Sequence, residues 1–149
     1  MSLLTGRIFY EAIKQDAELM EMIGGRIYAT AIEVPPTEED KTPLPYVILM
    51  SEPLTNDQST KDGFEGEYDQ ITISAEIAAD GTDEVLALAD KVRNTVFDYL
   101  TAVKAGEVES ENADLLPEDY QFSASGVAWD WMKPCHYMTL SWACDTKRV

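Results

Sequence analysis

The one histidine, His136, and the two cysteines, Cys135 and Cys144, are the side chains best suited to metal binding or nucleophilic catalysis. Cys135 and His136 are adjacent on an expected strand, where neighbouring side chains point to opposite faces, so they cannot share a metal ion or form a nucleophile–base pair. His136 and Cys144 would lie roughly 27 Å apart on a fully extended strand. We therefore expect no catalytic residues, no metal site and no cofactor. Two cysteines are too few for a disulfide framework and indicate reduced thiols of an intracellular protein.

Two other patterns lack residues that the corresponding sites require. Aligning Gly63 with the obligatory glycine of an EF-hand loop places Gln58 and Thr60 where calcium requires carboxylates. Ser123 and Ser125 lack the glycine two residues earlier that a nucleophile elbow needs. The sequence therefore predicts a protein that is not an enzyme.

The charge balance limits the kinds of partner that the protein can bind. The chain has 28 acidic and 11 basic side chains and a formal net charge of -17. Such a surface repels nucleic-acid phosphates and anionic lipids, so we expect neither direct sequence-specific nucleic-acid binding nor membrane binding.

The acids are concentrated in three segments, which hold 16 of the 28: residues 33–41, 52–69 and 104–119. They either keep the protein dispersed in water or form negative projections that line or rim a larger structure. The candidates for an acidic lumen or rim are Asp57, Asp62, Glu65, Glu67, Glu107, Glu109 and Glu111.

A length of 149 residues predicts a single domain covering 1–149. Hydrophobic periodicity predicts helices and strands in the following order: helical turns in the first 25 residues, strands near 26–28, 46–50 and 70–77, a helix over 82–103, and strands over about 120–131 and 135–144. Acidic connectors are expected at 33–45, 52–67 and 104–119. Runs of consecutive strands favour an α+β fold, with a mostly antiparallel sheet of about four to five strands and two main helices packed on one face.

Local signals mark where these elements begin and end. Asp16 is expected to cap a second helical stretch, and Gly24 and Gly25 to end it in the left-handed conformation. Thr82 is expected to cap the long helix. Alternation from Ile71 to Ile77 predicts a strand with one buried face.

The two final strands are expected to form a hairpin with one apolar and one mixed face. Met138, Leu140, Trp142 and Cys144 would face the core, with His136 at the margin. The other face would then carry Trp129, Trp131 and Tyr137 among small polar side chains. Aromatics in such surroundings are typical of an interface, so these three are candidate subunit-interface residues. The alternative is that they cover a sheet edge within the monomer.

Several short patterns together resemble those of one protein family. They are Asp16, Leu19 and Gly24-Gly25-Arg26-Ile27-Tyr28, then Pro43-Leu44-Pro45-Tyr46-Val47, the Ile71–Ile77 strand, and the helix with Ala89, Val92 and Arg93. Over roughly residues 3–103 the chain resembles the small tail-completion proteins of long-tailed bacteriophages and prophages, the tail terminator or tail-to-head joining family. The connector 104–119 and the terminal hairpin show no family pattern.

The resemblance implies an α+β subunit that assembles with further copies of itself into a ring, typically hexameric, where the tail tube meets the head. Its partners would be tail-tube and head-connector proteins. Its location would be the virion tail, and the host cytoplasm during assembly. An acidic lumen would let DNA pass without sticking, because like charges repel. The alternative function is a stand-alone acidic binding or decoy module that engages a basic protein partner.

Overall fold

The computed structural model describes residues 2–29, 43–56 and 63–147. Three α-helices and six strands follow one another in an α+β order, which confirms the predicted fold class. Their bounds are α1 Gly6–Lys14, α2 Ala17–Met22, β1 Ile27–Tyr28, β2 Tyr46–Thr55, β3 Tyr68–Ala79, α3 Thr82–Lys104, β4 Asp119–Ala124, β5 Ala128–Asp130 and β6 Cys135–Lys147. Short 3-10 helices lie at Ser2–Leu4 and Ala113–Leu115.

The strands form one mostly antiparallel sheet in the order β1-β2-β3-β6-β4, and β5 pairs with the beginning of β6. Only β1 and β2 run parallel. The long central pair β3–β6 extends from Tyr68 opposite Lys147 to Ala79 opposite His136. The short strand predicted near 26–28 is present as β1, and the strand predicted over about 120–131 is divided into β4 and β5.

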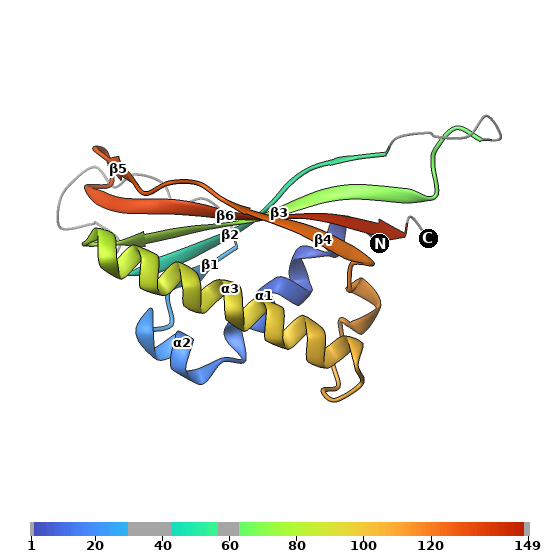
Figure 1. Cartoon of the computed structure of the whole chain (residues 1–149), viewed down its shortest axis with the longest axis horizontal. Helices are drawn as coiled ribbons and strands as arrows, with labels where there is room; N and C mark the ends of the chain where they lie inside the picture. Colours follow the sequence, from blue (N-terminus) through green and yellow to red (C-terminus); the bar gives the residue numbers. More distant parts are fainter. Residues whose placement is uncertain (1, 30–42, 57–62, 148–149) are drawn as a thin grey trace.

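All three helices cover one face of this sheet (Figure 1). The interior face of β3 presents Ile71, Ile73, Ala75 and Ile77, all buried as their alternation predicts. The predicted core face of β6, from Met138 to Cys144, is buried too. Helix α3 contributes an apolar stripe at helical spacing: Val85, Leu88, Val92, Val96 and Leu100.

Aromatic contacts hold the centre of this core together. The Trp142 ring on β6 lies 5.4 Å from the Phe9 ring of α1 and 5.6 Å from the Phe122 ring of β4, both tilted. Tilted pairs of this kind contribute about 1 kcal/mol each beyond the area they bury. Arg93 of α3 lies 4.2 Å above the outer side of Phe122, so a cation covers the edge of the core there.

The corner between α1 and β1 is built as the sequence predicts. Asp16 caps α2 by accepting a 3.1 Å hydrogen bond from the Leu19 backbone N–H. Gly24 and Gly25 have φ angles of 58° and 75°, which L-residues rarely adopt. They end α2 and turn the chain into the sheet. Arg26 then donates hydrogen bonds to the Pro45 and Leu44 carbonyl oxygens and so ties β1 to the start of β2.

Some predicted boundaries are wrong. The N-cap of α3 is Gly81, with extended backbone and no side chain to form a capping bond, and Thr82 is the first residue of the helix. The expected connector 52–67 is strand at its beginning, because β2 continues to Thr55; its predicted end agrees with the start of β3 at Tyr68. The connector 104–119 begins inside α3, contains a 3-10 helix and ends in β4. Of the connector 33–45, residues 33–42 lie outside the described residues.

Candidate functional site

The structure does not bring together the three side chains best suited to chemistry, His136, Cys135 and Cys144. His136 Nδ1 is 3.0 Å from the Asp80 carbonyl oxygen, which can only accept, so Nδ1 carries the proton in this contact. Cys135 is buried on the opposite face, and Cys144 is buried in the core. Burial, followed by nearby acids, raises the pKa of the Cys144 thiol to about 12. Across 2–29, 43–56 and 63–147, no group of three or more His, Cys, Asp or Glu side chains is placed to bind a metal ion.

The described acidic candidates fall into two separate groups. Glu65 and Glu67 lie on the hairpin between β2 and β3, and Glu107, Glu109 and Glu111 follow α3; all five are exposed. Figure 1 shows the two groups on opposite sides of the sheet. Asp57 and Asp62 lie outside the described residues.

A partly buried cluster of hydrogen bonds fixes the segment after α3. Glu11 of α1 accepts hydrogen bonds from the Tyr99 hydroxyl, at 2.7 Å, from the Ser110 hydroxyl, and from Asn112 Nδ2, at 3.3 Å. Gly106, with φ of 76°, turns the chain out of α3. The acidic side chains at 107–111 are therefore presented on an anchored loop.

The structure separates the three aromatic candidates. Trp129 and Trp131 contact each other edge to face, with ring centres 6.1 Å apart, and Trp129 packs in the same manner on His136 at 4.8 Å. Tyr137 instead belongs to a small cluster on the face away from the helices, with Tyr46, Ile48, Ala78 and Cys135. The prediction that Trp129, Trp131 and Tyr137 share one face of the sheet is therefore wrong.

A β-bulge explains this error. Ser123 lies opposite Ser141 in β4, yet Ala128 lies opposite Tyr137 in β5, so one additional residue is inserted near Gly126 and Val127. An insertion of one residue moves every later side chain to the other face. Trp129 consequently lies on the helix side, at the end of the sheet. Trp131 is 85% exposed and Met132 71% exposed, so this end carries an apolar projection, which we call the tryptophan tip (Trp129, Trp131, Met132).

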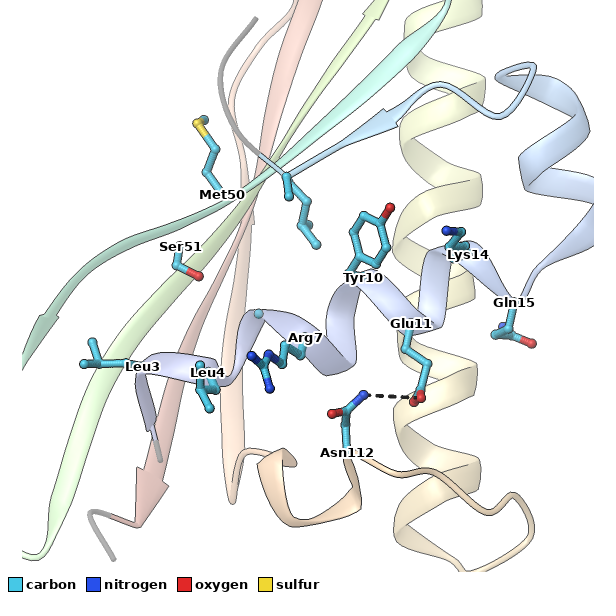
Figure 2. Close-up of a pocket in the computed structure, with 13 residues that line it drawn as sticks. Leu3, Leu4, Arg7, Tyr10, Glu11, Lys14, Gln15, Met50, Ser51 and Asn112 are labelled. Atoms are coloured by element: carbon cyan, nitrogen blue, oxygen red, sulfur yellow. Dashed lines mark hydrogen bonds between the residues drawn. The ribbon is translucent and has the colours of Figure 1, made fainter.

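Two further surfaces were not predicted. The first is an open groove of about 710 Å³ between α1 and the outer edge of β2 (Figure 2). Its apolar lining includes Leu3, Leu4, Tyr10, Leu49 and Met50. The strand β1 pairs only with Val47 and Ile48 of β2, so the next residues of that edge have no strand partner among the described residues. We call this surface the α1–β2 groove.

The charged side chains of the groove are Arg7, Glu11 and Lys14. Figure 2 shows Glu11 directed to Asn112 and away from Tyr10 and Lys14. Arg7 and Lys14 are exposed, and the Lys14 ammonium lies 5.5 Å from the centre of the Tyr10 ring. The groove is therefore largely apolar and carries two exposed cations on a strongly acidic protein. The spacing of Arg7, Tyr10 and Lys14 along one helix is the signal that would have indicated it.

The second surface is the hairpin that joins β2 and β3. Phe64, flanked by two glycines and two acids, is fully exposed. Asn56 fixes its base, donating to the Gly66 and Tyr68 carbonyl oxygens and to Asp69 Oδ1, and accepting from the Gly66 N–H at 2.6 Å. We call residues 63–67 the phenylalanine tip. A lone phenylalanine among glycines and acids is the sequence signal for it.

Comparisons with known proteins assign no function to these surfaces. No family model matches the sequence, and no curated protein matches it. Among solved structures, the gp17 protein of bacteriophage SPP1 is similar over 99% of this chain and 94% of its own, at 19% identity and a TM-score of 0.42. A TM-score below 0.5 does not establish a shared fold, so this similarity supports no functional assignment. Among the described helices, none is both long and apolar enough to cross a membrane.

Proposed function

We propose that this chain is a phage or prophage virion structural protein that assembles into a ring at the head-proximal end of the tail, as a tail terminator or head–tail joining protein. It acts without catalysis, by binding copies of itself and then tail-tube and head-connector proteins. It would reside in the virion tail after assembly in the host cytoplasm. The resemblance over residues 3–103 supports this class.

One structural observation carries the proposal. Exposed aromatic side chains lie at both ends of a single long sheet: the tryptophan tip next to β5 and the phenylalanine tip beyond β2 and β3 (Figure 1). Cyclic rings use head-to-tail contacts between different patches of the same subunit. A rigid subunit with adhesive surfaces at its two ends meets that requirement, because each end contacts a different neighbour.

The groove supports a binding role over a catalytic one. Among the described residues its lining contains neither histidine nor cysteine, and its carboxylate, Glu11, already accepts three side-chain hydrogen bonds. A general base must be within reach of a substrate proton, and Glu11 is directed to Tyr99 and Asn112 instead.

The exposed acids fit a ring through which DNA passes. Glu107, Glu109 and Glu111 are held on an anchored loop, and Glu65 and Glu67 project from a hairpin. We propose that at least one of these groups faces the channel, where negative charge repels phosphates. A structure of the ring with both groups on its outer wall would refute this role.

Molar mass in solution tests the proposal. The wild-type chain, over a concentration series and with or without tail-tube protein, should form closed rings visible by negative-stain electron microscopy. Trp131→Glu should weaken this assembly, because it places a charge on the tryptophan tip. Leu86→Glu, at a 47% exposed position on α3, is the matched control and should assemble as the wild type does. A chain that remains monomeric and binds only basic proteins would instead support the decoy function.

A further inference from the structure

The α1–β2 groove and the phenylalanine tip have complementary chemistry. The groove offers apolar side chains and two cations among the residues that the structure describes. The tip offers one fully exposed aromatic ring and an acidic side chain, Glu67, three residues later.

The charges favour a second copy of this chain as the occupant. With a net charge of -17, two copies repel each other over most of their surfaces. The groove is an exception, because Arg7 and Lys14 outnumber Glu11 there, and Glu11 is engaged in hydrogen bonds. An acidic segment of a neighbour therefore meets less repulsion at this surface than elsewhere on the molecule.

The tip is built to reach outwards. Figure 1 shows the ends of β2 and β3 running past the helical layer, so the tip points away from the groove of its own chain. The four hydrogen bonds of Asn56 hold the tip at a fixed angle to the sheet. A fixed projection loses little conformational entropy on binding, which favours affinity.

We propose that the phenylalanine tip of one copy docks in the α1–β2 groove of a second copy, with Phe64 among the apolar side chains and Glu67 beside Arg7 and Lys14. Tip and groove are different surfaces, so the contact is head-to-tail and can repeat from subunit to subunit. This inference rests on the proposed self-assembly and assigns the two surfaces that form one of its contacts.

Sedimentation velocity of the full chain tests the contact. Phe64→Ala should weaken self-association by about thirtyfold, as expected for a central aromatic hot spot. Phe97→Ala is the matched control, because Phe97 is 56% exposed on α3 outside the groove, and it should leave association unchanged. Arg7→Glu and Glu67→Arg should each weaken it about fivefold, and the double variant should recover part of the loss.

A mixing experiment tests the direction of the contact. Both variants also carry Trp131→Glu, so that the tryptophan tip makes no contact of its own. In that background Phe64→Ala retains its groove, and Leu3→Glu/Arg7→Glu retains its tip; each alone should be monomeric. An equimolar mixture should form dimers and nothing larger, because only one productive contact is available. Circular dichroism spectra and melting temperatures equal to those of the wild type would show that the variants are folded.

The outcomes separate this inference from the proposed function. If the wild-type chain assembles and Phe64→Ala assembles equally well, the docking is refuted and the ring stands. If the wild type stays monomeric at every concentration, both are refuted. A photo-crosslinker at position 64 should join α1 of a second, isotopically labelled copy; crosslinks confined to another surface or another protein would also refute the docking.

Discussion

The Tyr99 hydroxyl on α3 donates a 2.7 Å hydrogen bond to the Glu11 carboxylate on α1. The same carboxylate accepts from Ser110 and Asn112, so one side chain links two helices and the acidic loop that follows them. Burial, together with the Glu11 charge, raises the pKa of Tyr99, so the hydroxyl remains a donor at neutral pH.

Glu11→Ala should release that loop. The substitution leaves three donors without their acceptor, and hydrogen bonds to charged groups contribute about 1.5–3 kcal/mol each in favourable cases. We expect the free energy of unfolding to fall by about 2 kcal/mol in urea titrations, with faster hydrogen exchange at residues 107–112. Tyr99→Phe removes one donor only and should lose less. Unchanged exchange in Glu11→Ala would contradict an anchored loop.

Asp16 should stabilise the fold at neutral pH more than in acid. Partial burial opposes its ionisation, but hydrogen bonds from Thr95 and the Leu19 N–H, and the Lys91 cation, lower the pKa of Asp16 below its ordinary value. A lowered pKa gives stabilisation that is complete above the pKa of the unfolded chain, about 4, and is lost as pH falls through the folded value.

Asp16→Ala should therefore cost about 1–2 kcal/mol at pH 7, the usual loss for a helix cap. The difference from the wild type should shrink between pH 5 and 2, measured by urea unfolding at each pH. Glu18→Ala, at an exposed position in the first turn of α2, is the control and should cost less. A pH-independent difference would show that the Asp16 charge contributes nothing.

Both thiols should be unreactive while the chain is folded. Burial raises the pKa of Cys135 and, to about 12, that of Cys144. Thiolate is the reactive form, and at pH 8 a thiol of pKa 12 is ionised to about one part in ten thousand. Labelling with a disulfide reagent should be slow in buffer and fast in urea, with Cys135→Ser and Cys144→Ser assigning the sites. Rapid labelling of the folded chain would show that a cysteine is accessible.

Added salt should promote assembly. Repulsion between copies of net charge -17 acts over long distances, and raising ionic strength from 0.01 to 0.15 M shortens the Debye length from about 30 to about 8 Å. Contacts between adjacent charges in an interface are screened much less. Light scattering should therefore report larger assemblies as salt rises through this range. A steady decrease would indicate that charge attraction, not repulsion, dominates assembly.

Much of the fold could be predicted because it depends on local periodicity. Alternation from Ile71 to Ile77 and the apolar stripe of α3 are properties of single elements, and both are confirmed. Asp16 and Gly24 act within one turn of their own position. Such signals lie within a few residues, where a sequence can be interpreted without knowledge of the sheet.

The surfaces depend on relationships that the sequence does not carry locally. The groove combines α1 with a stretch of β2 some forty residues later, beyond the two residues of β2 that pair with β1 in the described part of the chain. The tryptophan face was mispredicted because the bulge at Gly126 interrupts a segment that otherwise alternates as one strand. Register is a property of two strands together, so one strand could not specify it.

The additional residue near Gly126 also has a consequence for how such subunits diversify. Because it sets which side of the hairpin the tryptophans occupy, deletion of a single codon there would transfer them to the opposite side with no change in composition. The tryptophan tip would then contact a neighbouring subunit from a different direction. Small insertions and deletions in this hairpin therefore offer a short mutational route to a new assembly geometry, while the helices and the central strands stay as they are.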